Sequence, residues 1–337
     1  MSAPQRVTSK SPIAPALSRT EANTLVSAAG MAPSVLNTQP WAFDVHDSTI
    51  DVYADPSRGL YWSVDPRGRQ LVISCGAALL NLRVAAAHLG RPAAVQLRPL
   101  PADPLLLASV TLGRRGERDR TNPADALLFA AIRHRHTHRG PFAPRTVPGA
   151  VLFELAECVH HEHANIAPIS RSQRRWLFDL VAFADIALGQ SPGYEPDLLK
   201  WTAGSTSRED GIPVSAFGSL SPSGLPPMRD FGALHGITGR QERFAPDPWI
   251  AILATPRDDT EAWLQAGQAL ERLLLTARLR GLAASFLNQP LDEPEIRHDL
   301  VSPALGGYPQ MILRLGYAAG DVATPRRRID DVWLAHR

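Results

Sequence analysis

The chain has 337 residues, of which 44% are apolar and 20% are charged, so it can form one large domain or two ordinary domains with buried cores. This composition excludes intrinsic disorder for most of the chain. The 35 basic and 33 acidic side chains leave a formal charge of +2, which lacks the positive surplus expected of a protein that coats nucleic acid. Lys10 and Lys200 are the two lysines of the sequence, so chemistry that depends on lysine is nearly excluded.

The cellular setting is indicated by what the sequence lacks. Its two cysteines lie far apart in apolar, helix-like stretches, which argues against a disulfide framework and favours a cytoplasmic protein. Residues 1–18 lack the apolar core of a signal peptide, and we expect them to form a flexible N-terminal arm. The most apolar window, 71–90, carries Asn81 and Arg83 near its middle, so it predicts a buried helix and no membrane span.

The first part of the chain, residues 19–120, alternates between helical and extended patterns. The periodicity predicts helices over 21–30 and 68–90, each ending at a glycine, and strands over 41–47, 49–55, 93–100 and 105–113. The first two strands are expected to pair across Asp47–Ser48. The arginine-rich stretch 113–125 has the composition of a linker.

The second part, residues 121–337, ends with the same order of elements as the first. The patterns predict helices over 124–133, 148–159, 172–188 and 260–281, and strands over 165–169, 249–255 and 310–315. In both parts a long Ala- and Leu-rich helix ends in glycine and is followed by a β run that ends in Leu-Gly. This order predicts a degenerate tandem duplication, although so few matches are also compatible with chance.

A segment of about 60 residues, 190–245, is rich in Gly, Ser and Pro and separates two predicted elements of the second part. Its aromatic residues, Tyr194, Trp201, Phe217 and Phe231, favour a lid that packs on the protein. A disordered insertion is the alternative.

Several motifs that would assign a function are absent from the sequence. It contains no P-loop, no G-x-G-x-x-G after a strand and no G-x-S-x-G. Its histidines form two clusters, RHRHTHR at 133–139 and VHHEH at 159–163. Arginines beside the first cluster would repel a divalent cation, and the second lies at a helix end, so we predict no metal site.

Two basic segments have the spacing of an anion site. Arg135, Thr137 and Arg139 alternate along an extended stretch and therefore point to one side, which suits a phosphate monoester. Arg326 and Arg328 have the same spacing in TPRRRID near the C-terminus. A solvated basic loop is the alternative for each segment.

The loop APSVLNTQPW, residues 32–41, is the most informative stretch. Two prolines stiffen it, and Ser34, Asn37 and Gln39 supply donors and acceptors. Such a rigid polar loop suits the polar edge of a heteroaromatic ring, and a tight turn is the alternative.

Three segments together resemble motifs of the FMN-dependent nitroreductase family, and within it the Acg-type proteins, whose single chain contains two nitroreductase-like halves. They are APSVLNTQPWAFDV, RHTHRGPFAPRTVP and GYAAGDVATPRRRIDDV. The resemblance covers nearly the whole chain from about residue 20, apart from the lid region. It implies an α+β nitroreductase-like fold in which two tandem halves, 19–120 and 121–337, form an intrachain pseudo-dimer around antiparallel sheets with long central helices. We therefore expect a monomer.

The resemblance also implies one FMN per chain, with flavin N5 carrying the chemistry and no catalytic side chain. It assigns the phosphate to Arg135, Thr137, Arg326 and Arg328, with His136 in the same segment, and the flavin ring to Pro33, Ser34 and Asn37. It further assigns the pyrimidine edge to Arg139 and, more weakly, the surroundings of N5 to Asn288 and Gln289. Two halves could form a second, equivalent flavin site. The segments that would form it lack both the paired arginines and the loop, so we expect that site to be empty.

Three functions are compatible with these observations. The first is an oxidoreductase that transfers hydride through flavin N5 to a small-molecule acceptor, a nitroaromatic or a quinone, with NADH or NADPH as reductant. The second is a protein that sequesters FMN under its lid with little turnover. The third, an anion- or nucleic-acid-binding module, is weakened by the near-neutral charge.

Overall fold

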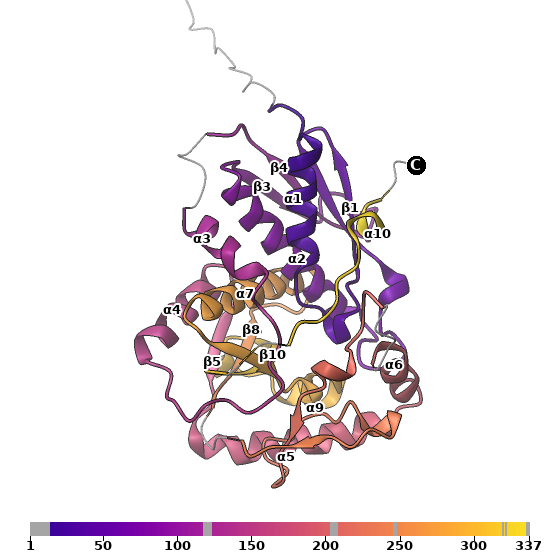
Figure 1. Ribbon diagram of the computed structural model, residues 1–337, viewed down its shortest axis with the longest axis vertical. Helices are drawn as coiled ribbons and strands as arrows, with labels where there is room; N and C mark the ends of the chain where they lie inside the picture. The colour runs from indigo at the N-terminus through magenta and orange to yellow at the C-terminus, as the bar shows by residue number, and fades with distance from the viewer. Residues whose placement is uncertain are drawn as a thin grey trace, which may run out of the picture.

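The computed structural model describes residues 14–116, 123–202, 208–244, 248–318, 320 and 322–334. Within them the chain is α+β, with two four-stranded antiparallel sheets and one two-stranded parallel sheet. In Figure 1 the first part of the chain, in indigo, lies above the second, and long helices lie between the two large sheets. Parts of the expected arm and linker, 1–13 and 117–122, lie outside the described residues.

The first part forms one sheet with two helices against it. Its elements are α1 (Arg19–Gly30), β1 (Trp41–His46), β2 (Thr49–Ala54), α2 (Arg69–His88), β3 (Ala93–Leu97) and β4 (Leu106–Leu112), with strand order β1-β2-β4-β3. The predicted hairpin of β1 and β2 is confirmed, with Asp47 at φ 49° in its turn. β3 is shorter than predicted because Arg98, at φ 47°, leaves the extended conformation.

The second part forms the other large sheet. Its elements are α3 (Pro123–Ile132), α4 (Gly149–His160), β5 (Asn165–Pro168), α5 (Arg171–Gly189), β8 (Trp249–Thr255), α7 (Thr260–Leu279), β9 (Ala283–Phe286), α8 (Gln289–Asp292), α9 (Pro294–Asp299), β10 (Tyr308–Gly316) and α10 (Ile329–Val332). The strand order is β5-β8-β10-β9. The patterns missed β9, α8, α9 and α10, which are all too short for a clear periodicity.

The two large sheets have the same topology. In each part a helix precedes the first strand, the second strand leads into a twenty-residue helix, and the last two strands form a hairpin-like pair. The strand orders correspond one to one, with β5, β8, β9 and β10 in the places of β1, β2, β3 and β4. This correspondence supports the predicted repeat of two halves, whose origin by duplication stays a prediction.

One hydrophobic core runs through both parts. It contains buried residues of α1 and α2 from the first part and of α3, α4 and α7 from the second. α2 is long and apolar enough to cross a membrane, but 83% of its apolar window is buried here, as expected for a core helix. α5 covers the opposite face of the second sheet with Leu177, Phe178 and Val181 against Ile250, Ile252 and Ile312.

The described residues of the 190–245 segment are folded. They form α6 (Tyr194–Trp201), β6 (Ser219–Leu220) and β7 (Arg240–Gln241), with short 3₁₀ turns at Val214–Ala216 and Ala233–His235. Tyr194, Leu198 and Trp201 pack with Leu60 and Val64 of the first part. A disordered insertion is therefore wrong for 190–202 and 208–244, and this segment is called the lid segment below.

The C-terminal tail returns to the first part of the chain. Trp333 bridges to Phe43 of β1, and the Leu334 N–H donates to the Phe43 carbonyl at 2.8 Å. α10 packs against α1, as the yellow tail in Figure 1 shows. On its way the tail passes the loop between α1 and β1, which brings Thr324 and Arg326 to the site described next.

Candidate functional site

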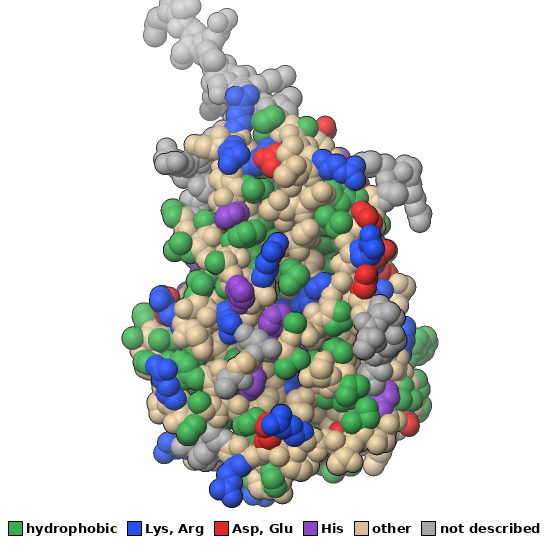
Figure 2. All heavy atoms as spheres, in the orientation of Figure 1, with side chains coloured by type: hydrophobic (Ala, Val, Ile, Leu, Met, Phe, Trp, Pro, Cys, Tyr) green, Lys and Arg blue, Asp and Glu red, His purple; other side chains and the backbone are tan. Residues whose placement is uncertain are grey.

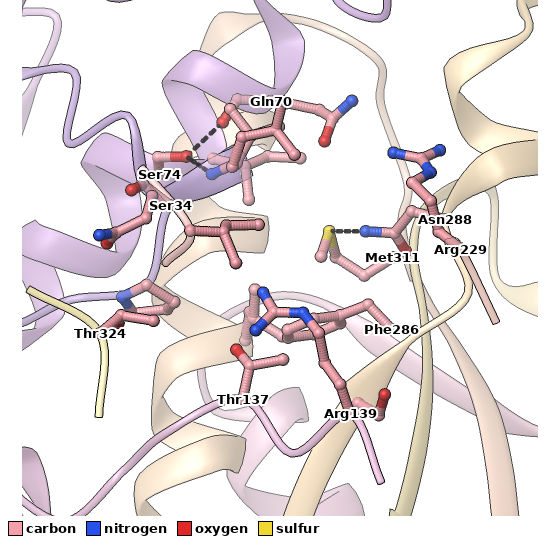
Figure 3. Close-up of a pocket in the computed structure, with 18 of the residues that line it drawn as sticks. Ser34, Gln70, Ser74, Thr137, Arg139, Arg229, Phe286, Asn288, Met311 and Thr324 are labelled. Carbon is pink, nitrogen blue, oxygen red and sulfur yellow. Dashed lines mark hydrogen bonds between the residues drawn. The ribbon is translucent and has the colours of Figure 1, made fainter. Parts of the chain in front are cut away.

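One large pocket lies where the two parts, the lid segment and the tail meet (Figure 3). Its empty space, counted together with the open solvent at its mouth, is about 1150 Å³. Nine of the eleven predicted binding residues line it: Pro33, Ser34, Asn37, Arg135, Thr137, Arg139, Asn288, Gln289 and Arg326. Segments far apart in the sequence therefore form one site.

The loop after α1 has an unusual backbone. The backbone angle φ is positive at Leu36, Asn37 and Gln39, with values of 45°, 55° and 51°. Residues other than glycine rarely adopt such values. The Ser34 hydroxyl accepts a hydrogen bond from the Gln39 N–H at 2.9 Å, and the Val35 N–H donates to the Ser74 hydroxyl of α2 at 3.2 Å. Backbone strain held in place by such contacts is typical of binding sites.

The Asn37 side chain joins the loop to the lid segment and the tail. Its Nδ2 donates to the carbonyls of Gly211 at 2.9 Å and Pro325 at 3.0 Å, and its Oδ1 accepts from Arg326 Nη1 at 3.1 Å. Gln39 makes similar contacts, to the Glu209 carbonyl and the Arg327 N–H. The loop thus positions both segments that border the pocket.

Two arginines from distant segments meet at one end of the pocket. Arg135 and Arg326 each donate to the Met31 carbonyl at 3.2 Å, and Arg135 Nε lies 3.3 Å from Glu271 Oε1 of α7. The Nε groups of both arginines are buried and make no hydrogen bond within the described part of the chain. Burial and the Arg135 charge lower the pKa of Arg326 to about 9, although Glu271 opposes this. This end of the pocket therefore suits an anion.

Arg139 connects the predicted phosphate segment to the lid segment. Its Nη1 donates to the Ala216 carbonyl at 3.0 Å, and its guanidinium lies 5.4 Å from the centroid of the Phe231 ring. Burial lowers its pKa to about 10, so it remains charged at neutral pH. Figure 3 shows Thr137 and Arg139 side by side along one edge of the pocket, as their alternation predicts.

Another wall of the pocket is built by the second sheet and α8. Asn288 Oδ1 accepts from the Ile312 N–H at 2.9 Å, and its Nδ2 lies 3.6 Å from Met311 Sδ. Gln289 is buried beside it at the start of α8. Ser285 also belongs to this wall, and its buried hydroxyl has no hydrogen-bond partner among the described residues.

Ion pairs connect the lid segment to α5 and α8 beside the pocket. Arg229, which lines the pocket, lies 3.2 Å from Asp292 of α8 and 3.4 Å from Asp185 of α5. Gln70 Nε2 of α2 also donates to Asp292, at 2.7 Å. Burial raises the pKa of Asp292 to about 6 against the opposing effect of Arg229.

Two predicted site residues lie outside the pocket. His136 points away from Thr137 and lines a small cavity with His134 and Arg278, as expected for the intervening position of an extended stretch. The Arg328 side chain is exposed, because Arg328 is the N-cap residue of α10 and its N–H donates to Glu209. Among the described residues no group of three His, Cys, Asp or Glu side chains could hold a metal ion.

Several residues of the site are not indicated by the patterns of the sequence. They lie within largely apolar helices and strands: Gln70, Ser74, Glu271, Ser285 and Met311. The available signal was the presence of polar residues on otherwise apolar helix faces, at positions 70, 74 and 271.

A group of buried ion pairs joins the turn after α4 to α2 and α7. The turn after α4, which corresponds to the loop after α1, carries Glu162. Its carboxylate binds Arg83 and Arg272 at 2.7 Å, and Arg272 also binds Asp125 at 2.6 Å. These buried pairs occupy the polar groups that an anion would need.

Figure 2 gives the charge on one face of the molecule. Basic and histidine side chains are spread across the middle of this face, where acidic ones are sparse. Such a distribution favours the approach of anionic molecules.

Comparisons with known proteins agree with the motifs. No protein-family model matches the chain. A protein of Mycobacterium tuberculosis named "Putative NAD(P)H nitroreductase" is 33% identical over 317 residues, which cover 92% of this chain and 90% of the relative. A second, "Putative NAD(P)H nitroreductase acg" of the same organism, is 33% identical over 321 residues, or 91% and 93% of the two chains. The chain belongs to the nitroreductase family. It is thus a member of a family of oxidoreductases, and its α+β fold is that of a nitroreductase.

Two solved nitroreductases show weaker similarity to this nitroreductase chain. The FMN-dependent nitroreductase NfnB of Mycobacterium smegmatis, solved with NADPH, is 16% identical, with 61% of this chain and 96% of that chain covered and a TM-score of 0.37. A nitroreductase of Bacteroides fragilis with bound FMN is 17% identical, with 60% and 94% covered and a TM-score of 0.35.

Proposed function

We propose that this nitroreductase binds one FMN per chain in the large pocket and transfers hydride from NADH or NADPH to a small-molecule acceptor. The observation that carries the proposal is the pair Arg135 and Arg326. Both side chains line the pocket together with Thr137, and both donate to the Met31 carbonyl, so the two guanidinium groups lie close together. Their charges oppose each other and the single carboxylate of Glu271 offsets only one of them, so an anion such as the phosphate of FMN would stabilise the pair.

The remaining lining residues fit the rest of the cofactor. Pro33 and Ser34 would lie along the flavin ring, Arg139 would approach its pyrimidine edge, and Asn288 with Gln289 would lie near N5. When bound, FMN supplies the hydride-transfer chemistry. The chain orients the ring between the loop after α1 and the second sheet, while Met228 and Phe231 of the lid segment limit the access of water.

A second function is favoured by the lid segment. It contacts Asn37, Arg139 and Asp292, which all line the pocket. A lid that stays closed would exclude nicotinamide and leave a protein that holds FMN with little turnover. The acceptor class, a nitroaromatic or a quinone, and the monomeric state follow from the resemblance to the family, whereas the proposed cytoplasmic location follows from the two isolated cysteines.

Two measurements test the proposal. The purified protein should be yellow and contain about one FMN per chain, and a colourless protein that takes up no FMN would refute both functions. Anaerobic addition of NADPH or NADH should then bleach the flavin, and a dithionite-treated sample serves as the fully reduced control. A flavin that dithionite bleaches and nicotinamides do not would favour the second function.

A further inference from the structure

Glu271 is a buried carboxylate directly behind the anion site. It lies in α7, is fully buried, and neither of its oxygens accepts a hydrogen bond of normal geometry within the described residues. Its closest charged neighbour is Arg135, at 3.3 Å from Nε to Oε1. A carboxylate in this position is costly as an anion, because burial removes it from water and its few polar neighbours compensate only in part.

Few groups face Glu271. They are Arg135 from the segment after α3, Arg326 from the tail and the Asn81 amide from α2. The next residue of α7, Arg272, binds Asp125 and Glu162 and so does not neutralise Glu271. Burial raises the pKa of Glu271 to about 7 although Arg135, Asn81 and Arg326 lower it. The charged and uncharged forms of the Glu271 carboxyl are therefore similarly populated near neutral pH.

Binding of a phosphate monoester would change the net charge of the buried group formed by Arg135, Arg326 and Glu271. Two arginines and one carboxylate carry a net charge of one positive unit, and a phosphate dianion brings two negative units. The buried group would then hold one uncompensated negative charge in a medium of low dielectric constant. Protonation of Glu271 removes that charge and also the repulsion between carboxylate and phosphate.

We propose that Glu271 is a proton-binding residue of this anion site, and that its carboxylate takes up one proton from solvent when a phosphate monoester binds Arg135 and Arg326. The inference rests on the proposed function, because it takes the phosphate of FMN as the anion. Glu271 does not touch the cofactor and acts on it through Arg135. The predicted consequence is that FMN binds more weakly as the pH rises above neutrality.

The test compares FMN with riboflavin, which lacks the phosphate. The dissociation constant of each flavin is measured from its fluorescence when the holoprotein is diluted at several values between about pH 7 and pH 8.5. In this range the phosphate of FMN, with a second pKa of about 6, stays dianionic. We expect the dissociation constant of FMN to rise about tenfold across the range and that of riboflavin to stay constant.

Glu271→Gln provides the matched variant, since it keeps the volume of the side chain and cannot titrate. The rise with pH should disappear for FMN in this variant. Proton uptake measured directly with a pH-indicator dye on FMN binding near pH 8 should approach one per FMN in the wild type and zero in the variant. A slope that persists in Glu271→Gln would assign the effect to the arginines and overturn the proposal.

The outcomes separate this inference from the proposed function. FMN that binds without a pH dependence and without proton uptake would refute the role of Glu271 and leave the flavin site intact. A protein that binds neither flavin would refute the proposed function. Riboflavin binding with the same pH dependence as FMN would show that the phosphate is not the linked group and would also overturn the proposal.

Discussion

Gly76 of α2 and Gly267 of α7 meet where the two central helices cross. A Cβ atom on Gly76 would lie 2.4 Å from the Leu264 carbonyl oxygen, and one on Gly267 would lie 2.0 Å from that of Ile73. Each glycine therefore lets the backbone of the other helix approach. Because Ile73 and Leu270 of these helices line the pocket, this crossing also sets the shape of the site.

The first prediction concerns this crossing. Gly267→Ala should lower the free energy of unfolding by about 1–3 kcal/mol or more, since the methyl group would force the helices apart. Gly189→Ala, at the end of α5 where nothing lies within 4 Å of the added Cβ, is the control and should be neutral or stabilising. Chemical denaturation of both variants measures the difference. Equal stability of the two variants would contradict the close approach.

The second prediction separates two neighbouring arginines of the tail. Arg326→Ala should weaken FMN binding about 10- to 100-fold, because a hydrogen bond to a charged group contributes about 1.5–3 kcal/mol. Arg328→Ala should leave FMN binding unchanged, since Arg328 is exposed and lies outside the pocket. Fluorescence titration of both variants at one ionic strength provides the comparison. A loss of FMN from Arg328→Ala alone would refute the assignment.

The two basic segments, 135–139 and 326–328, show how far residue spacing in the sequence predicts a site. Arg135, Thr137 and Arg139 were correctly expected to share one side, since Thr137 bridges to Ala284 and the stretch is extended. Equal spacing gave the same expectation for Arg326 and Arg328. It did not hold there, because the Arg328 side chain is exposed although its backbone, at φ −63° and ψ 153°, is still extended. Equal spacing therefore predicts a shared side for the stretch that pairs with β9 through Thr137 and Ala284, and does not do so for the tail.

The roles of Glu271 and Gln70 in the site could not be predicted from the sequence for a different reason. Each lies in a twenty-residue helix whose residues are mostly buried, so periodicity gives no single exposed face. Their roles depend on what the crossing of α2 and α7 places opposite them. By contrast, the loop after α1 was predictable because its prolines and polar residues form a local motif.

The third prediction concerns the closure of the lid segment. Arg229→Ala removes the ion pairs to Asp185 and Asp292, so the segment should open more often. We expect faster proteolytic cleavage within 190–245 and faster bleaching of the flavin by NADPH. Arg240→Ala is the control in the same segment, because Arg240 is 77% exposed and pairs with Glu242 at the surface. If both variants are cleaved at the wild-type rate, Arg229 does not hold the segment closed.

The last prediction is the pH dependence of stability without bound flavin. The pKa of Glu271 rises from 4.5 to about 7 on folding, so between these values the folded state binds more protons than the unfolded state. The contribution of Glu271 to stability must then fall as the pH rises from about 4.5 to about 7, and stay low above that. Glu271→Gln abolishes this loss, since the amide does not ionise. In thermal unfolding of the flavin-free proteins, the melting temperature of the variant should therefore change less over this interval than that of the wild type. At pH 8 the melting temperature of the variant should exceed that of the wild type. Parallel curves for the two proteins would show that Glu271 ionises at an ordinary pKa in the folded protein.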